Sequence, residues 1–222
     1  MDVNSLKVDI NRALSNLFST RMKLGLFNGN PRQLPFSDIG SNQVCSQDHQ
    51  ALALEAARSG IVLLQNSANL LPSPKTQTNS LAVIGPNADA PPALLVNLSL
   101  LCKHCRVMAT THITYKEAVD LAKSVDYVVL IMGLDQTQER EEQDRDDLGL
   151  PGMQESLVSR VVDAAKKPVM LVILSGGPVD VSFAKNNNKV GGIIWGGYRG
   201  EGGGVALAEI IFGDQNPDLK LN

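Results

Sequence analysis

Aromatic residues are scarce in this chain of 222 residues, where Phe, Trp and Tyr together make up 4%. That scarcity argues against a stacking platform for single-stranded nucleic acid. Strong positive charge is missing too, because 23 acidic side chains outnumber 20 basic ones and the formal net charge is −3. The chain lacks a basic footprint for nucleic acid or an anionic membrane surface, so we expect neither as a partner.

Long apolar runs are also missing. No run approaches the roughly 20 residues that a membrane-spanning helix needs, and the opening MDVNSLKVDINRALSNLF lacks the apolar core of a signal peptide. We therefore expect neither a membrane span nor a signal peptide in this sequence. Hydrophobic residues nevertheless make up 43%, which suffices for a sizeable core. The length suits one large domain or one domain with appendages.

Cysteine is rare and poorly placed for metal chemistry. The three cysteines are Cys45, Cys102 and Cys105. A structural zinc site needs four ligands, and the pair in Cys102-Lys-His-Cys105 has no second pair to complete it. No strand leads clearly into it, which argues against a thioredoxin-type pair. We predict no metal and no cofactor, and the sequence leaves the disulfide pairing open.

Apolar runs alternate with helical patterns along the chain. Strands are predicted over Leu81–Gly85, Val125–Met132, Pro168–Leu174 and Val190–Trp195. Helices are predicted over 1–24, 47–65, 114–124, 151–166 and 205–212, with a short helical piece at 183–185. Near-continuous apolar strands are typical of a parallel sheet that is covered on both faces. The sequence therefore predicts a three-layer α/β/α sandwich with a mostly parallel sheet.

The strand that ends at Met132 opens into an acidic stretch, with seven carboxylates and two arginines between Asp135 and Asp147. Ligands of α/β proteins bind outside the carboxyl ends of the strands. Crowded carboxylates can raise the pKa of one member, which makes a general acid near neutral pH, and arginines can hold the others ionised. A merely solvated loop is the alternative. The first candidates for a site are Glu139, Arg140, Glu141, Glu142, Asp144 and Arg145.

A second loop, Gly196–Gly204, is rich in glycine and leads from a strand into a helix. That is the setting of a phosphate-binding turn, but the Walker lysine is missing and Glu201 would stand among the amides. A closely packed turn that shapes one wall of a pocket is the better interpretation. Trp195 and Tyr198 could stack on a sugar, although core packing suits the tryptophan equally well.

Several ordered motifs carry a resemblance to family 3 glycoside hydrolases, and above all to the plant β-D-xylosidase and α-L-arabinofuranosidase type. The motifs are LGLFNGNP, HQALALEAARSGIVLLQN, LAVIGPNADA, VVLIMGLDQTQEREEQDRDDLGLPGMQ, VILSGGPVDVSFAKNN and GGIIWGGYRGEGGG…AEIIFGDQNP. They cover most of the chain from about Leu24 to Pro217. One departure is Arg199, which stands where the family usually has proline.

The resemblance implies an architecture of barrel, α/β sandwich and often a fibronectin-like domain. Residues 1–45 are then expected to be the last barrel helix and a linker, and residues 46–222 the sandwich domain. The barrel would be supplied in cis in a full-length form. The family also implies pentose-containing oligosaccharides as partners and an extracellular or cell-wall location.

The resemblance further implies a retaining mechanism with a barrel aspartate as nucleophile and a sandwich glutamate as general acid/base. The family's glutamate lies two to four residues before an Asp-Arg pair. It maps first to Glu141, ahead of Asp144-Arg145, and second to Glu139. Arg140, Asp144 and Arg145 would orient the loop or bind substrate.

Two functions stay open on this basis. The chain could be the acid/base half of a β-xylosidase that degrades cell-wall xylan, in which case it is expected to be inactive by itself. Alternatively, it could be a non-catalytic sugar-binding or interaction module derived from that domain.

Overall fold

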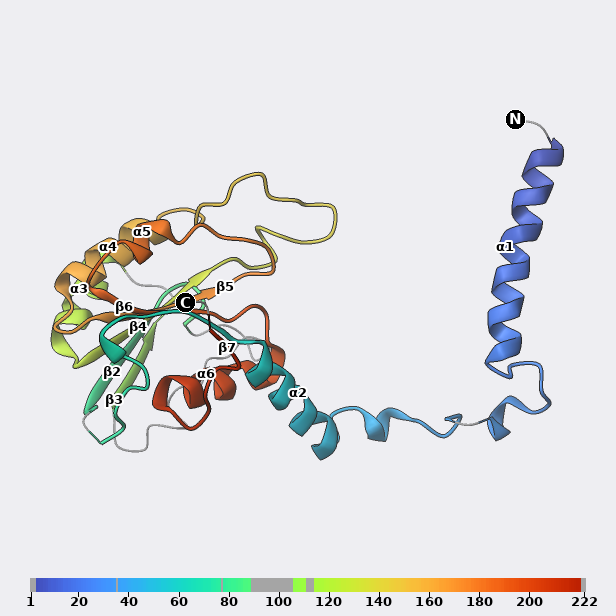
Figure 1. The fold of residues 1–222 in the computed structure, drawn as a ribbon, viewed down its shortest axis with the longest axis horizontal. Coiled ribbons are helices and arrows are strands. Elements are labelled where there is room, and N and C mark those ends of the chain that lie inside the picture. The colour runs from blue at the N-terminus through green and yellow to red at the C-terminus, as the bar shows by residue number, and fades with distance from the viewer. Residues whose placement is uncertain (1–2, 35, 77, 89–105, 111–113, 221–222) are drawn as a thin grey trace. The chain divides into compact units, whose positions relative to one another are not determined.

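The computed structural model describes residues 3–34, 36–76, 78–88, 106–110 and 114–220. Contacts between residues divide the chain into two compact units, Met1–His49 and Gln50–Asn222. Figure 1 shows the elements of both. Cys45 is exposed in the first unit. Cys102 and Cys105 lie outside the described residues, so the predictions on that pair and on disulfide pairing stay predictions.

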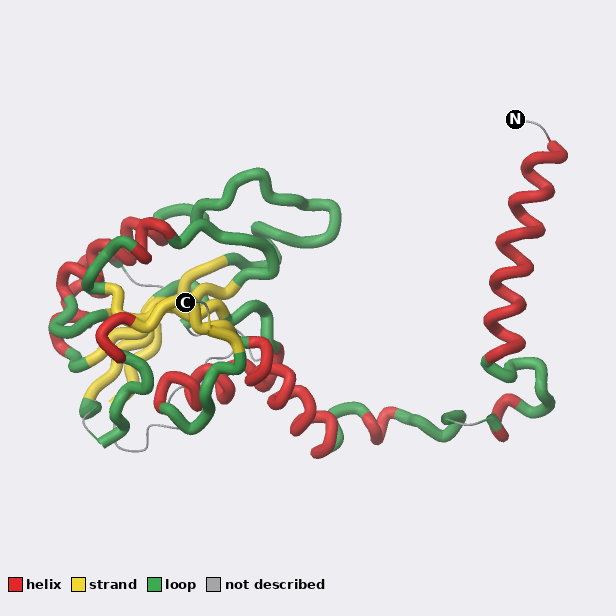
Figure 2. Tube along the Cα trace, in the orientation of Figure 1, coloured by secondary structure: helices red, strands yellow, loops and turns green. Residues whose placement is uncertain are grey.

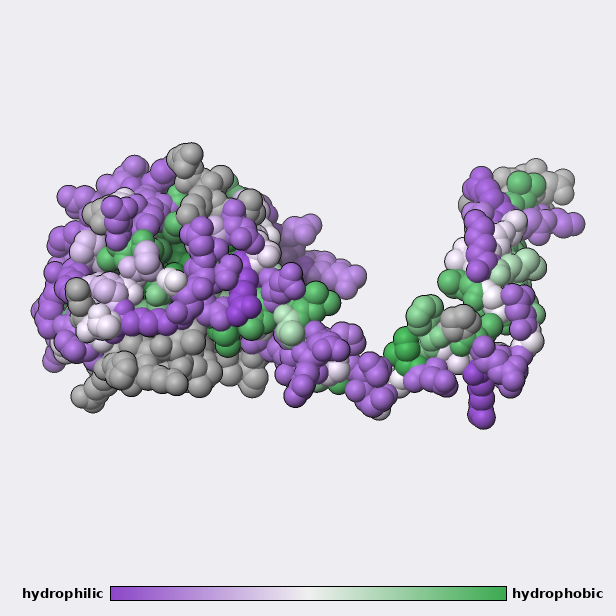
Figure 3. Space-filling model, turned by 60° about the horizontal axis from the view of Figure 1, so that its bottom comes forward, coloured by the Kyte–Doolittle hydropathy of each residue, from purple (hydrophilic) through white to green (hydrophobic). Residues whose placement is uncertain are grey.

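The first unit consists of helix α1 (Val3–Lys23), which confirms the predicted helix, and an irregular segment with two 3₁₀ turns, Pro31–Gln33 and Ser41–Gln43. The rings of Phe18 and Phe27 contact each other with centroids 6.0 Å apart. Figure 3 shows apolar residues in green on the surface of this unit. The exposed apolar side chains of α1 include Leu6, Val8, Ile10, Leu14, Leu17, Phe18 and Met22. No helix among the described residues is long and apolar enough to cross a membrane.

The second unit is built on a seven-stranded sheet. Its strands cross in the order β3-β2-β4-β5-β6-β1-β7, and every neighbouring pair is parallel except β1 and β6. This confirms the predicted, mostly parallel sheet. The strand bounds are β1 Val62–Asn66, β2 Ser80–Ile84, β3 Arg106–Thr110, β4 Tyr127–Gly133, β5 Val169–Leu174, β6 Val190–Trp195 and β7 Leu219–Lys220.

Helices cover both faces of the sheet, as Figure 2 shows. Helices α2 (Gln47–Gly60) and α6 (Gly203–Phe212) pack on one face. Helices α3 (Tyr115–Ser124), α4 (Gln154–Ala164) and α5 (Ser182–Lys185) pack on the other. These two layers complete the predicted sandwich.

Strand β4 contributes side chains to both hydrophobic cores, one on each face of the sheet. Because successive side chains of a strand point to opposite faces, Val129 and Ile131 join the core under α2 and α6, whereas Val128 and Leu130 join the core under α3 and α4. Every residue of β4 is buried. Full burial of one such side chain contributes about 1.5–3 kcal/mol, so an unbroken apolar run is what a strand between two helical layers requires.

The prediction of one helix over 47–65 is wrong beyond Gly60. Helix α2 ends at Gly60, and Val62–Asn66 forms β1, which pairs antiparallel with β6. The periodic apolar stripe of α2 runs directly into the strand, so the pattern alone did not separate them. Strands β3 and β7 were also not predicted. The other predicted elements begin and end within about three residues of the observed bounds.

Candidate active site

Three loops follow neighbouring strands at one edge of the parallel part of the sheet. The acidic loop, residues 134–153, follows β4; the turn Ser175–Pro178 follows β5; and the glycine-rich loop Gly196–Gly204 follows β6. Strand β5 pairs with β4 on one side and with β6 on the other. Figure 1 shows the acidic loop in yellow, extending away from the sheet. Ligands of such sheets bind at this edge.

Glu139 joins these three loops. Its Oε1 accepts hydrogen bonds from the backbone N–H of Gly176, at 2.6 Å, and from the hydroxyl of Tyr198, at 2.5 Å. Its Oε2 accepts one from the N–H of Gly177, at 3.1 Å. Consecutive backbone N–H groups of this kind form a cradle for an anion. We call Glu139, Gly176, Gly177 and Tyr198 the latch.

Electrostatics keep the latch in its hydrogen-bonded form. Burial alone would raise the pKa of Glu139, but the three hydrogen bonds and the charge of Arg145 lower that pKa below its ordinary value. Burial raises the pKa of Tyr198, and the hydrogen bond to Glu139 raises it further. The carboxylate therefore stays ionised as an acceptor, while the phenol keeps the proton that it donates.

Glycine at both positions of the β5 turn leaves room for the Glu139 carboxylate in the latch. A Cβ added at Gly176 would lie 3.0 Å from Oε1 of Glu139 and 3.3 Å from the Tyr198 ring. A Cβ at Gly177 would lie 3.3 Å from Oε2 of Glu139. Both distances to the carboxylate are shorter than an ordinary van der Waals contact, so glycine gives the carboxylate access to the amides.

The residues after Glu139 form a tight hairpin, Arg140–Gln143. The N–H of Gln143 donates to the carbonyl of Arg140 at 2.9 Å, and the reverse bond is 3.4 Å long. Glu141 and Glu142 occupy the turn, and both side chains are exposed. Glu142 has φ +65°, a left-handed conformation that costs a non-glycine residue about 1–2 kcal/mol. The hairpin thus presents Glu141 outward at its apex.

A hollow of about 350 Å³ lies inside the acidic loop, where it is lined by Glu139, Asp144, Arg145 and Pro178 among others. Nη2 of Arg145 donates to the carbonyl of Gly149 at 2.6 Å. Its Nη1 is buried and has no hydrogen-bond partner among the described residues. Arg145 therefore closes the base of the loop and places positive charge beside the carboxylates.

The structure divides the predicted site residues into two groups. Glu139, Asp144 and Arg145 line the hollow together with Arg140. Glu141 is not part of that lining and lies at the exposed hairpin turn. Sequence reasoning missed the tie between Glu139 and the Gly176-Gly177 turn. A paired glycine directly after a buried strand was the available signal for it.

The glycine-rich loop confirms the interpretation as a packed turn. A Cβ at Gly202 would lie 2.9 Å from Cα of Leu54. The Arg199 guanidinium lies over the Trp195 ring at 5.0 Å and donates to the carbonyls of Gly196 and Gly60. The indole N–H of Trp195 donates to Oγ of Ser175 at 3.0 Å. Trp195 is therefore part of the packing, whereas Tyr198 is 41% exposed.

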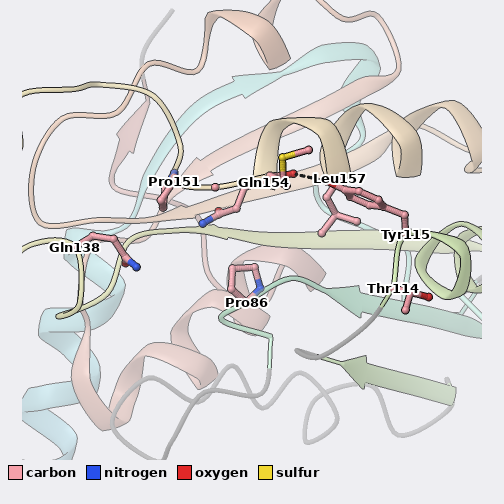
Figure 4. A pocket seen from close by; sticks show the side chains of 9 residues that line it. Pro86, Thr114, Tyr115, Gln138, Pro151, Gln154 and Leu157 are labelled. Carbon is pink, nitrogen blue, oxygen red and sulfur yellow. Dashed lines mark hydrogen bonds between the residues drawn. The ribbon is translucent and has the colours of Figure 1, made fainter.

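A larger cavity of about 660 Å³ lies beyond the ends of β2 and β4, with Pro86, Tyr115 and Leu157 in its walls. Figure 4 shows its lining. The amide of Gln154 is already used, because it bonds both the N–H and the carbonyl of Gly133 at 2.8 Å. The hydroxyl of Tyr115 donates to the carbonyl of Met153 at 3.3 Å.

The part of the chain that the structure describes has no evident metal-binding site. No group of three or more His, Cys, Asp or Glu side chains there is arranged to hold a metal ion. Glu139, Asp144 and Asp147 line the hollow, whereas Glu141 and Glu142 lie on the exposed hairpin.

The fold and the loops define an α/β sandwich domain with a candidate site at the carboxyl ends of its strands, and the comparison with known families assigns this domain to a family. Residues 61–222 match the Glycosyl hydrolase family 3 C-terminal domain. The chain belongs to glycosyl hydrolase family 3, which confirms the resemblance found in the motifs.

Relatives and solved structures agree with this assignment. Probable beta-D-xylosidase 7 from Arabidopsis thaliana is 53% identical over 97% of this chain and 31% of its own length. Exo-1,4-beta-xylosidase xlnD from Aspergillus awamori is 33% identical over 96% of this chain and 30% of its own length. A structure of the GH3 exo-beta-xylosidase XlnD with a xylobiose aziridine probe matches with a TM-score of 0.79 at 35% identity, covering 93% of this chain and 29% of that one. This chain spans about a third of the length of the curated relatives that it matches.

Proposed function

We propose that this chain is the acid/base-bearing domain of a retaining exo-glycosidase that acts on β-1,4-xylo-oligosaccharides and arabinoxylan. Two findings support the proposal: the family assignment and the relatives named β-xylosidases. The relatives are about three times longer. The aspartate nucleophile would belong to a barrel domain in cis, for which residues 1–45 would supply the last helix and a linker.

In the proposed reaction, the barrel aspartate attacks the anomeric carbon while Glu141 protonates the departing glycosidic oxygen. Glu141, now a carboxylate, then takes a proton from the water that hydrolyses the glycosyl-enzyme intermediate. Both steps need a carboxyl group that can exchange a proton with a reacting atom. Retaining chemistry also needs two carboxyl groups about 5–5.5 Å apart, so this chain by itself is expected to be inactive.

The hydrogen bonds that Glu139 already accepts are the observation that favours Glu141 as the general acid/base. Both oxygens of Glu139 already accept hydrogen bonds, three in all, and its pKa is lowered. A group held as a carboxylate is a poor proton donor. Glu141 lies two residues further along, exposed at the hairpin apex, where its carboxyl can approach a substrate held by another domain.

The remaining loop residues would orient this carboxyl. Arg140 begins the hairpin through its backbone pair with Gln143, and Arg145 closes the loop base on Gly149. Asp144 is exposed beside the hollow and is available to a substrate hydroxyl. We also propose that the full-length protein works outside the cell, because its proposed polysaccharide substrate belongs to the cell wall.

A hybrid enzyme tests this function. This chain would replace the matching 30% of Beta-D-xylosidase 3 from Arabidopsis thaliana, which is 46% identical to it. Glu141→Gln should slow hydrolysis of substrates with poor leaving groups about 10²–10⁴-fold, and that of activated aryl xylosides far less, because a good leaving group departs without protonation. Azide should restore the second step by attacking the glycosyl-enzyme intermediate directly.

Asp146→Asn is the matched control, since it removes an exposed carboxylate from the same loop, and it should leave both activities unchanged. If Glu139→Gln gave the leaving-group dependence and the azide product instead, the acid/base assignment would move to Glu139. An inert hybrid, together with xylo-oligosaccharide binding by the chain alone, would favour the non-catalytic module.

A further inference from the structure

We propose that Glu139 and Tyr198 are positioning residues, which hold the hairpin Arg140–Gln143 in one orientation by tying the acidic loop to the two neighbouring loops. The identity of the positioned group, Glu141, rests on the proposed function. The attachment of the acidic loop to its two neighbours does not depend on the proposed function, because it is inferred from the hydrogen bonds of the latch.

The latch sits where it controls the hairpin. Glu139 directly precedes Arg140, the first residue of the hairpin, so fixing the Glu139 carboxylate fixes the point at which the hairpin begins. Two adjacent amides each bond a different carboxylate oxygen, at 2.6 and 3.1 Å. Such two-point contacts set the orientation of a carboxylate as well as its position.

Tyr198 extends the tie to a third loop. Its hydroxyl reaches Glu139 from the loop after β6, 59 residues away in the sequence. Its ring also lies against the β5 turn, because a Cβ added at Gly176 would meet both the ring and the carboxylate. The latch thus ties the acidic loop to the loops that follow β5 and β6. A loop held on several sides keeps its orientation better than one held only at its ends.

The far side of the hairpin is braced separately. Nε2 of Gln143 donates to the carbonyl of Thr137 at 3.2 Å, and Oδ1 of Asp135 accepts from the N–H of Thr137 at 2.7 Å. These bonds are internal to the acidic loop. They maintain the shape of the loop, whereas the latch sets its direction relative to the sheet, so the two roles can be separated by mutation.

Three variants open the latch in different ways. Glu139→Gln replaces an acceptor oxygen with an amide that cannot accept, Tyr198→Phe removes a donor but keeps the ring, and Gly176→Ala displaces the carboxylate without removing any polar group. Gly149→Ala is the matched control in the acidic loop, because its added Cβ would meet Asp147 at 3.5 Å, an ordinary contact.

Trypsin cleavage of the 222-residue chain after Arg140, followed by mass spectrometry, reports hairpin mobility. Arg140 is exposed in the hairpin, so cleavage there depends on how often the hairpin opens. We expect about tenfold faster cleavage in Glu139→Gln and Gly176→Ala, and a smaller rise in Tyr198→Phe. Each rate is divided by the rate for an unfolded peptide of the same sequence, because residues 139 and 141 flank the cleaved bond. On that scale, Glu141→Gln and Gly149→Ala should match the unsubstituted chain. Because Glu139 and Tyr198 share one hydrogen bond, the double variant should gain less than the product of the single effects.

The hybrid enzyme supplies the functional readout. With a poor leaving group, Glu139→Gln and Tyr198→Phe should lower kcat with little change in KM, since the substrate still binds but the acid is misplaced. Neither variant should form glycosyl azide, because the Glu141 carboxylate is still present, whereas Glu141→Gln should form it.

Each contrary result identifies what failed. Unchanged cleavage after Arg140 in all three latch variants would overturn the inference and leave the role of Glu141 intact. Faster cleavage with unaltered kcat would show that the direction of the hairpin does not matter, which also overturns it. Glycosyl azide from Glu139→Gln would overturn both proposals. Thermal unfolding shows whether each variant is folded. If Glu139→Gln and Gly176→Ala are not, the cleavage rate and kcat of Tyr198→Phe, the mildest change, test the inference.

Discussion

Arg58 on α2 and Glu209 on α6 form a two-point ion pair, with Nε bonded to Oε2 at 2.6 Å and Nη2 to Oε1 at 2.5 Å. Only 13% of the Glu209 side chain is exposed, against 33% for Arg58. The hydrogen bond to Glu209 raises the pKa of Arg58 above its ordinary value. This pair joins the two helices that cover one face of the sheet, so it links the N-terminal side of the second unit to its C-terminal helix.

Arg58→Ala should lower the free energy of unfolding of the second unit by about 2 kcal/mol, because it removes hydrogen bonds to a charged group and leaves a mostly buried carboxylate unpaired. Trp195 is the single tryptophan, so urea denaturation followed by its fluorescence reports on this unit. Lys189→Ala is the control in the same unit, since its pair with Asp163 is exposed at 52% and 78% and its loss should change stability by less than about 1 kcal/mol. Equal effects of the two substitutions would contradict a structural role for the Arg58–Glu209 pair.

The extent to which this fold can be predicted from sequence depends on how local the signal is. Strands β4, β5 and β6 are continuous apolar runs, and Val190–Trp195 was predicted with its observed bounds. The apolar pattern predicts a helix across β1, because the pairing of β1 with β6 involves residues about 130 positions away, such as Val62 with Trp195. No local pattern records such a pairing.

In the candidate site, too, local features could be predicted from the sequence and long-range contacts could not. The acidic loop was located by its charge and by its place after a buried strand. The contact between Glu139 and Tyr198 could not be predicted, since it depends on the adjacency of β4, β5 and β6, and on glycines that give the carboxylate access to the amides. The sequence contains Glu139 and Glu141 as near-equivalent candidates, and only their different surroundings separate them.

Glu142→Gly should stabilise the hairpin. Glu142 has φ +65°, where glycine avoids the steric cost of a side chain, and the gain should be about 1 kcal/mol after the larger entropy loss of glycine is counted. The measurement is the rate of trypsin cleavage after Arg140, divided by the rate for an unfolded peptide of the same sequence, and this ratio should fall several-fold. Glu141→Gly at the preceding turn position is the comparison and should not slow cleavage. Faster cleavage in Glu142→Gly would show that the Glu142 side chain supports the hairpin.

The contribution of Glu139 to stability should depend on pH. Its pKa is lowered in the folded chain, so its stabilising effect is fully present above the ordinary glutamate value of about 4.3. That effect is lost as the pH falls through the lowered folded-state pKa. The difference in unfolding free energy between the unsubstituted chain and Glu139→Gln should therefore be constant near neutrality and shrink in acid. Urea denaturation from pH 7 down to the acid limb measures it. A difference that stayed constant at every pH would show that the carboxylate charge is not what the latch binds.

Gly133→Ala should be among the most damaging single-methyl changes in this chain. Gly133 ends β4 with φ +134°, and a Cβ there would run into the carbonyl oxygen of Leu174 on β5. The backbone cannot yield easily, because the Gln154 amide holds both polar groups of Gly133, so we expect a loss of about 3 kcal/mol or more. Gly152→Ala is the matched control: it also has positive φ, at +62°, but nothing lies within 4 Å of its added Cβ. It should cost about 1 kcal/mol from backbone strain alone. Similar losses in the two variants, measured by urea denaturation, would show that the close approach of β4 to β5 is not what requires glycine at the start of the acidic loop.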